Sequence, residues 1–270
     1  FKSDVSENLK VEILEKICDY IRLEKYKGKS TSIVFSGFHQ KSDICMEKVN
    51  SLYEVQTEPN LIMNIQSSWK KFDDYTQSMS SKYRQRVNKV YKQTADLEIK
   101  VFSENDIQLN EDQMIELYKN VANHASFNMA YLTKGYFVAM KLLFQDQFIV
   151  KGYYLKGELI GFTSAFYKNK NQYVHFIGMN YEVNDLMPLY HRILLEFVYE
   201  SILHQHQVVY LGRTATEIKT TIGAEPIEMY NYIRLSKSWY MCMAPKVLHK
   251  FGAKPYIVRR PFKELQEASI

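Results

Sequence analysis

The chain of 270 residues carries a formal net charge of +5, and 46% of its residues are hydrophobic, which excludes intrinsic disorder as an overall description. The mild positive charge suits a phosphorylated ligand, an anionic membrane surface or RNA equally well. Three scattered cysteines form no disulfide framework or zinc motif, and no signal peptide or run of about 18 apolar residues is recognisable, so we expect a cytoplasmic protein without a bound metal.

The first 66 residues predict a small α/β segment. Apolar residues recur at helical spacing between residues 5 and 26, and Gly28 ends that helix. Short buried strands are expected after it, at residues 31–38, 52–55 and 61–65. The last two are separated by Glu58-Pro59-Asn60, which is a turn signal. This segment is short for a complete domain.

Residues 67–93 combine helical periodicity with a strongly basic run. The positive side chains are Lys82, Arg84, Arg86, Lys89 and Lys92. One interpretation is the solvated face of an amphipathic helix, since runs of charge usually lie on the surface. The other is a contact with a phosphate or a polyanion, which needs a groove beside the helix.

From residue 97 onward the pattern becomes regular. It predicts a strand, two helices, three strands and a long helix, at residues 97–102, 111–123, 136–144, 147–155, 159–167, 172–181 and 189–202. A strand, a short helix and a final strand follow, the strands at residues 208–211 and 226–235. The whole reads β-α-α-β-β-β-α-β-α-β.

The stretch at residues 208–226 carries the sharpest functional signal before any family is considered. The strand breaks at Gly212, and we expect a helix whose first turn carries Thr214. Free N–H groups and the dipole favour an anion at such a helix start. Arg213 and Lys219 place two positive charges within reach of it. The alternative is purely structural: a turn glycine, a capping threonine and two solvated charges.

The C-terminal segment, residues 239–270, predicts a helix at 239–251 and a basic, then polar, tail. Its mixture of apolar and basic residues suits a lipid surface, so contact with the inner face of the membrane is one expectation. Packing of the same apolar residues on the domain is the commoner arrangement.

The element order, the segment Ser80-Ser81-Lys82-Tyr83-Arg84-Gln85-Arg86-Val87, and Leu211-Gly212-Arg213 followed by Lys219 resemble the Fem-type branch of the GNAT acyltransferase superfamily. The resemblance implies an α+β fold with a central mixed, mostly antiparallel sheet flanked by helices. It implies a GNAT-like domain at residues 67–238, preceded at 1–66 by a truncated α/β half. It also implies transfer of an acyl or aminoacyl group to an amine.

The resemblance further implies where the donor binds. In the GNAT arrangement the strand before the long helix splays from its neighbour, so its free backbone groups can hold the donor carbonyl. The residues implied for donor or substrate binding are Phe176, Gly178, Met179, Gly212, Arg213, Thr214, Lys82 and Arg86. By the same analogy Lys219 stabilises the transition state.

The general base and the donor stay open. His175 and Glu217 are candidate bases, with Tyr181 and Tyr210 as alternatives, although strand histidines are more often hydrogen-bonded core residues. Residues 182–190 contain no glycine, whereas GNAT enzymes that use acyl-CoA usually carry a glycine-rich pyrophosphate loop there. An acyl carrier protein or an aminoacyl-tRNA therefore joins acyl-CoA as a candidate donor.

The leading functional hypothesis is an N-acyltransferase that acts on an amine of a lipid, a sugar or a cell-wall precursor. A non-catalytic binding module that keeps the fold is the second hypothesis, because fold does not fix function. An RNA-binding protein that uses the basic helix is the third, and no DNA contact is expected. The sequence gives no oligomeric state.

Overall fold

The computed structural model describes residues 6–25, 32–39, 52–124, 131–235 and 255–263. The chain forms two compact units, residues 1–60 with 226–256, and residues 61–225 with 257–270. Each unit is discontinuous in sequence, which differs from the three contiguous segments that the sequence predicted. The helix expected at 239–251 lies outside the described residues. Within the described part of the chain, no helix is both long enough and apolar enough to cross a bilayer.

The first unit is discontinuous because its strands come from both ends of the chain. β1 (Ser32–His39) pairs antiparallel with β8 (Glu225–Leu235), so that Ser32 lies opposite Leu235. Helix α1 (Glu7–Asp19) continues as the π-helical segment η1 (Tyr20–Lys25). The hydrogen-bonded pairing of β1 with β8 joins segments that are far apart in the sequence, and local sequence patterns do not predict such pairing.

β2 (Leu52–Asn64) is one strand, so the turn expected at Glu58-Pro59-Asn60 is wrong. Its last residues, Leu61 to Asn64, pair antiparallel with β7. Pro59 lies outside that registered pairing, where its missing N–H costs no ladder hydrogen bond to β7.

The strands of the second unit occur in the chain order predicted for residues 97–212. Beside the end of β2 lie, in spatial order, β7 (Val208–Gly212), β6 (Asn171–Met179), β5 (Glu158–Lys168), β4 (Phe148–Leu155) and β3 (Leu97–Val101). Neighbours are antiparallel except β6 and β7, which are parallel. The prediction of a mixed, mostly antiparallel sheet is confirmed.

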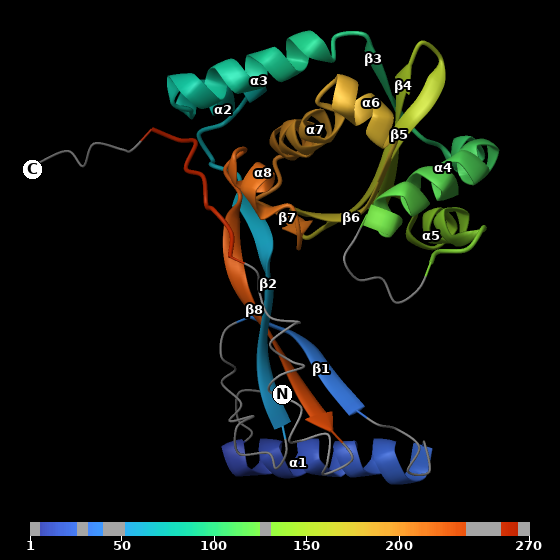
Figure 1. The fold of residues 1–270 in the computed structure, drawn as a ribbon, viewed down its shortest axis with the longest axis vertical. Helices are drawn as coiled ribbons and strands as arrows, with labels where there is room; N and C mark the ends of the chain where they lie inside the picture. Colours follow the sequence, from blue (N-terminus) through green and yellow to red (C-terminus); the bar gives the residue numbers. More distant parts are fainter. Residues whose placement is uncertain (1–5, 26–31, 40–51, 125–130, 236–254, 264–270) are drawn as a thin grey trace, which may run out of the picture. The chain divides into compact units, whose positions relative to one another are not determined.

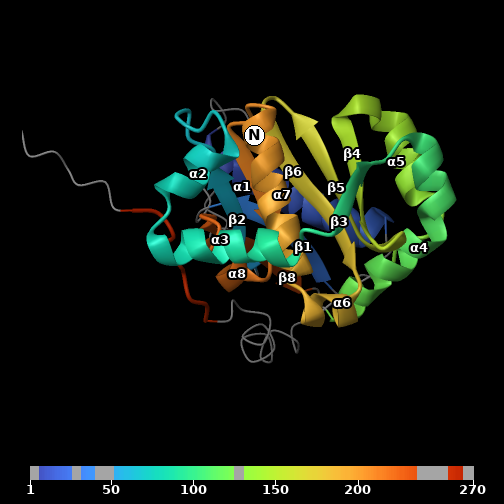
Figure 2. The same cartoon turned by 90° about the horizontal axis from the view of Figure 1, so that it is seen from above.

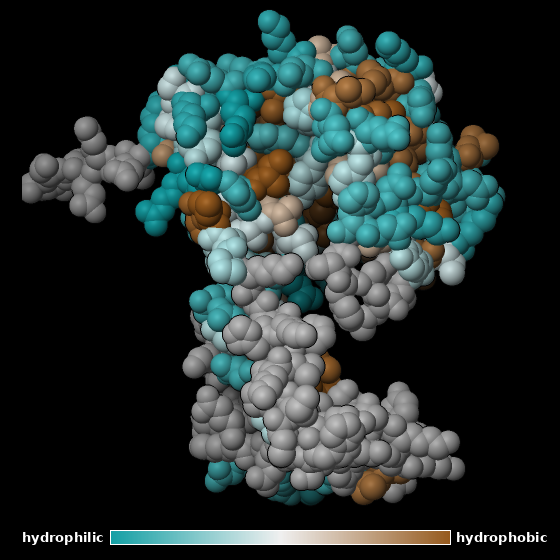
Figure 3. Space-filling model, in the orientation of Figure 1, coloured by the Kyte–Doolittle hydropathy of each residue, from teal (hydrophilic) through white to brown (hydrophobic). Residues whose placement is uncertain are grey.

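Helices cover both faces of this sheet (Figures 1 and 2). α4 (Glu104–His124) and α5 (Tyr136–Phe144) pack on one face, and α7 (Leu189–Leu203) packs on the other. α2 (Phe72–Ser78) and α3 (Ser81–Gln93) lie beyond α7. The shorter elements are η3 (Gln145–Gln147), α6 (Tyr181–Leu186) and α8 (Thr216–Thr220). On the face of this unit seen in Figure 3, hydrophilic residues predominate and hydrophobic ones lie in small groups.

The basic region expected as one helix is broken between α2 and α3. Met79 forms an isolated antiparallel bridge with Phe262, and the Ser80 N–H donates to the Pro261 carbonyl at 2.9 Å. The Phe262 ring packs 5.4 Å from Trp69 and 6.1 Å from Tyr75. The C-terminal segment 257–263 is therefore part of the second unit, and it sets where α3 begins.

We expect Phe262→Ala to lower the free energy of unfolding by about 3 kcal/mol, because it removes a ring that packs on two core aromatic residues. Urea denaturation measures the change. Ile257→Ala is the matched control, since Ile257 is 55% exposed in the same segment and should change stability by less than ~0.5 kcal/mol. Equal effects of the two substitutions would contradict this packing.

Candidate functional site

The parallel pairing of β6 and β7 stops early. Its register runs from Asn171 opposite Val208 to Tyr173 opposite Tyr210. The rest of β6, residues 174–179, has no registered partner on β7, and both segments lie in the described part of the chain. On its other side β6 stays paired with β5 as far as Met179 opposite Gly161. Because an unpaired strand edge presents N–H and C=O groups, this opening can bind a carbonyl.

A β-bulge lies at the start of the opening. The register of β5 and β6 steps from Thr163 opposite Ile177 to Ala165 opposite Val174, so β6 has one extra residue there. His175 and Phe176 together therefore oppose Ser164. Bulges re-aim side chains and are common beside active sites. Here both rings lie on the face covered by α4 and α5: Phe176 packs 5.3 Å from Tyr118, and His175 packs 5.8 Å from Phe148.

His175 is hydrogen-bonded at both ring nitrogens. Its Nε2 lies 3.1 Å from the Tyr136 hydroxyl, and its Nδ1 lies 3.2 Å from Ser164 Oγ. The Phe176 N–H donates to the same Ser164 Oγ at 3.1 Å. Burial lowers the pKa of His175 to about 4, so the imidazole is neutral near pH 7. A neutral imidazole can accept a proton, which keeps His175 a candidate base.

The turn after β7 has a strained backbone. Gly212, Thr214 and Ala215 have φ values of 73°, 65° and 50°. Positive φ suits the glycine but is unusual for a β-branched threonine. The prediction that Thr214 lies in the first turn of a helix is wrong, because α8 begins at Thr216 and has 5 residues. So short a helix does not provide the expected anion site at its start.

Lys219 holds that turn together. Its side chain is buried, and its Nζ donates to the carbonyls of Leu211 and Arg213, each at 2.8 Å. A longer contact, 3.4 Å, reaches the carbonyl of Gly212. The ammonium thus lies beside the Arg213 backbone, while the Arg213 side chain is exposed. The geometry gives Lys219 a structural role, and its part in charge stabilisation stays a prediction.

Glu217 is paired with the C-terminal segment. Arg259 Nε donates to Glu217 Oε1 at 3.1 Å, and the Arg259 N–H donates to Thr220 Oγ1 at 3.0 Å. The ion pair raises the pKa of Arg259. Glu217 thus faces the C-terminal segment, whereas His175 lies on β6 beside the opening, so His175 is the better-placed candidate base.

Lys82 and Arg86 are both exposed on α3, but they lie near different neighbours. Lys82 is in the first turn of α3, beside the segment that carries Pro261. The charge of Arg86 acts on His191 in the first turn of α7, where burial, and to a smaller extent Arg86, lowers the His191 pKa to about 4. Arg86 therefore lies close to the start of α7.

Gly178 is needed for packing. A Cβ at this position would lie 2.2 Å from the Phe162 ring and 2.9 Å from the backbone of Leu117 in α4. The glycine lets α4 approach β6 closely. The neighbouring Met179 is buried in the cluster under α7. Donor contact by Phe176, Gly178 or Met179 stays a prediction for their backbone groups.

The start of α7 is already occupied in part by protein groups. Asn184 Oδ1 accepts from the Tyr190 N–H at 2.9 Å. Glu182 and Asp185 are exposed in the same connection. A pyrophosphate would need those N–H groups and would be repelled by the two carboxylates.

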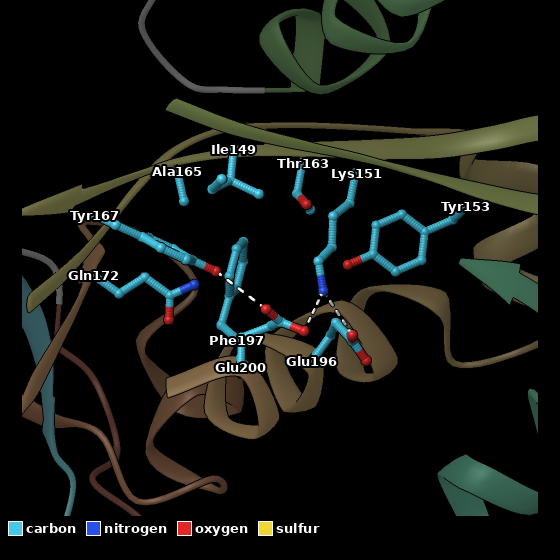
Figure 4. Close-up of a pocket in the computed structure, with 10 residues that line it drawn as sticks. All are labelled: Ile149, Lys151, Tyr153, Thr163, Ala165, Tyr167, Gln172, Glu196, Phe197 and Glu200. Carbon is cyan, nitrogen blue, oxygen red and sulfur yellow. Dashed lines mark hydrogen bonds and ion pairs between the residues drawn. The ribbon is translucent and has the colours of Figure 1, made fainter. Parts of the chain in front are cut away.

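A buried ion network between the sheet and α7 was not predicted (Figure 4). Lys151 extends from β4 between Glu196 at 2.9 Å and Glu200 at 2.6 Å, and Arg192 Nη1 lies 2.6 Å from Glu196. Burial raises the Glu196 pKa, but attraction by Lys151 and Arg192 outweighs it and the net pKa is lowered. The cavity beside the network is about 10 Å³, room for about one water molecule.

This network balances its own charges and leaves no space for a substrate, so its role is to fix α7 against β4. Three charged residues spaced four apart on a largely apolar helix, Arg192, Glu196 and Glu200, were the signal in the sequence. Among the described residues, no cluster of three or more metal-ligating side chains is present.

Comparisons with known proteins support the fold. No protein-family model matches the chain, and no curated protein sequence matches it. The C-terminal domain of a putative lysylphosphatidylglycerol synthetase from Agrobacterium fabrum has a similar structure, with a TM-score of 0.57 and 10% identity over 94% of this chain and 82% of that one. A GCN5-related N-acetyltransferase from Sphaerobacter thermophilus has a TM-score of 0.56 and 8% identity over 85% and 69%.

FemX has a TM-score of 0.54 and 11% identity, over 88% of this chain and 80% of that one. Identities this low establish the fold alone. The chain has the GNAT fold, as its element order predicted.

We expect Lys219→Met to lower the free energy of unfolding by about 2 kcal/mol, because two carbonyls lose a charged hydrogen-bond donor. Arg213→Ala is the matched control in the same turn, and its exposed side chain predicts a change below ~0.5 kcal/mol. Urea denaturation compares them. A Lys219→Met variant as stable as the wild type would show that the lysine does not hold the turn.

Gly178→Ala should destabilise the protein by about 2 kcal/mol, since its methyl group meets a ring and a helix backbone. Gly161→Ala, on the adjacent strand, brings its methyl group only to 3.3 Å from the nearest atom and should cost clearly less. Thermal unfolding measures the change in stability of both variants. If Gly161→Ala is the more damaging, the close approach of α4 to β6 is wrong.

Proposed function

We propose that the chain is an N-acyltransferase that transfers an acyl or aminoacyl group from a thioester or ester donor to an amine of a lipid, a sugar or a cell-wall precursor. The observation that carries the proposal is the open edge of β6 at residues 174–179, within a GNAT fold. The putative lysylphosphatidylglycerol synthetase domain and FemX share this fold, which supports an aminoacyl donor among the candidates.

The open edge supplies what acyl transfer needs first. A backbone N–H directed away from β5 donates to the donor carbonyl, which polarises the carbon and stabilises the oxyanion that forms. The edge is preorganised, because the bulge and the pairing with β5 fix it before any ligand arrives. Arg213 adds an exposed positive charge from the turn that follows the neighbouring strand.

The donor is better matched by a carrier-linked acyl group or an aminoacyl ester than by free acyl-CoA. The Tyr190 N–H is already bonded to Asn184, and Glu182 and Asp185 are exposed beside it. A donor whose phosphates lie elsewhere avoids this repulsion. Lys82 and Arg86, which are exposed on α3, can bind such phosphates or an acidic carrier protein.

The test is a transfer assay with purified protein. Acetyl-CoA, palmitoyl-CoA, palmitoyl acyl carrier protein and lysyl-tRNA serve as donors, and phosphatidylethanolamine vesicles, glucosamine and a lysine-containing cell-wall peptide serve as acceptors. Mass spectrometry detects the amide product. We expect at least one pair to react, and Arg213→Ala to lower kcat/KM by about tenfold with unchanged melting temperature, as loss of one charge contact implies.

Lys168→Ala is the control for Arg213→Ala, because Lys168 is an exposed cation at the end of β5 and has no part in the proposed donor site. Two results would contradict the proposal: no product from any pair, or equal activity of the wild type and Arg213→Ala. Donor binding without any transfer would instead favour a non-catalytic binding module.

A further inference from the structure

Tyr136, His175 and Ser164 form a hydrogen-bonded chain that starts beside the opening in the sheet. His175 is on β6, two positions after Tyr173, the last residue registered with β7. Tyr136 is the first residue of α5, and Ser164 is on β5. The Tyr136 ring stacks on the imidazole at 5.9 Å with an angle of 25° between their planes. The sequence separates Tyr136 from His175 by 39 positions, so only the fold brings them together.

The position of Tyr136 is fixed from α4. The Gly135 N–H donates to the buried carboxylate of Glu111 at 2.6 Å, and Gly135 has a φ of 89° that favours glycine. Helix α5 therefore begins at a defined place, with the Tyr136 ring against β6. Tyr136 itself is partly exposed, so its hydroxyl can meet a ligand on that side.

One protonation state satisfies every contact in the chain. Ser164 Oγ accepts from the Phe176 N–H at 3.1 Å, and lies 3.5 Å from the Phe176 carbonyl, to which it can donate. Its remaining lone pair can accept from His175 Nδ1–H at 3.2 Å. A hydroxyl has one proton and two lone pairs, so this set is complete. It leaves His175 Nε2 as the acceptor for the Tyr136 hydroxyl.

We propose that Tyr136 is the catalytic residue that exchanges protons with the reacting amine and the leaving group, and that His175 and Ser164 act through it. This inference rests on the proposed N-acyltransferase function. Phe148, Phe166 and Phe176 surround the imidazole. Within the described part of the chain, Tyr136 is the titratable residue that contacts it. The proton path therefore runs through Tyr136.

The proposed transfer returns Tyr136 and His175 to the protonation states in which they began. The amine nitrogen attacks the donor carbonyl carbon and forms the C–N bond. Its proton passes to Tyr136 Oη while the phenol proton passes to His175 Nε2. The donor C–O or C–S bond then breaks, and its electron pair leaves on the oxygen or sulfur. The proton on His175 returns through Tyr136 to that atom, so the products are an amide and an alcohol or a thiol.

Tyrosine alone would be a poor base for this step. Burial raises the pKa of Tyr136, so its hydroxyl is protonated at neutral pH and needs an acceptor for that proton. Burial keeps His175 neutral at pH 7, so its Nε2 lone pair is available to the Tyr136 hydroxyl, which lies 3.1 Å away. Ser164 holds the ring in the one tautomer that presents Nε2.

The experiment compares Tyr136→Phe, Ser164→Ala and the matched control Tyr131→Phe in the transfer assay. Tyr131 is 53% exposed, and its hydroxyl donates to Asn123 rather than to His175. We expect Tyr136→Phe to lower kcat about 100-fold or more with KM nearly unchanged, as loss of acid–base catalysis predicts. Ser164→Ala should lower kcat about tenfold by the same principle, and Tyr131→Phe should lower it less than about twofold.

Nitrogen NMR of the His175 ring gives a readout that a merely structural role would not move. The wild type should show the Nδ1–H tautomer, and Ser164→Ala should lose that preference, because the variant lacks the oxygen that accepts from Nδ1. A wild type that transfers acyl groups with a Tyr136→Phe variant of equal kcat would overturn the relay and leave the proposed function standing. A wild type with no transfer would overturn both.

Discussion

The feature on which the functional account depends is the short pairing of two parallel strands. Tyr173 and Tyr210 stack at 4.5 Å with their planes 5° apart at the last registered pair, and Ser201 of α7 donates to Gln172 on the other face. The paired end is thus held from both sides. Beyond it the bulge turns β6, while Gly212 ends β7. The opening is built into the sheet and does not need a ligand to form.

Two polar clusters lie on opposite faces of this sheet, and they differ in charge. Removing ions from water is costly, and the network of Lys151, Glu196 and Glu200 is tolerable only because its members pair with one another. It ties α7 to β4, which is separated from β6 by β5. The Tyr136, His175 and Ser164 chain on the opposite face is neutral instead, so a proton can move along it without an opposing fixed charge.

Local patterns in the sequence predicted much of the fold. The helix at Tyr136–Phe144 was predicted at its observed bounds, and the hairpin at Lys156-Gly157 joins two strands whose observed bounds lie within about one residue of the predicted ones. Helical and strand periodicity are local properties, so one sequence suffices for them. The continuous β2 and the pairing of β1 with β8 were missed, because strand partners lie far apart along the chain.

The candidate site was less predictable for the same reason. The sequence drew attention to His175, Lys219 and Glu217 by residue type, but not to their partners. Lys219 bonds to backbone carbonyls, which have no signature in a sequence. Glu217 meets Arg259, 42 positions away, and Ser164 faces His175 only because β6 carries a bulge. The sequence identified residues with suitable side-chain chemistry, whereas their contacts depend on the tertiary structure.

Amide hydrogen exchange along β6 tests the central claim most directly. In the free protein, the amides of residues 174–179 that point away from β5 should exchange faster than those of residues 171–173, because they lack a partner on β7. Adding a donor that supports transfer should slow them selectively. Uniformly slow exchange in the free protein, or no change when the donor binds, would contradict a donor site at the open edge.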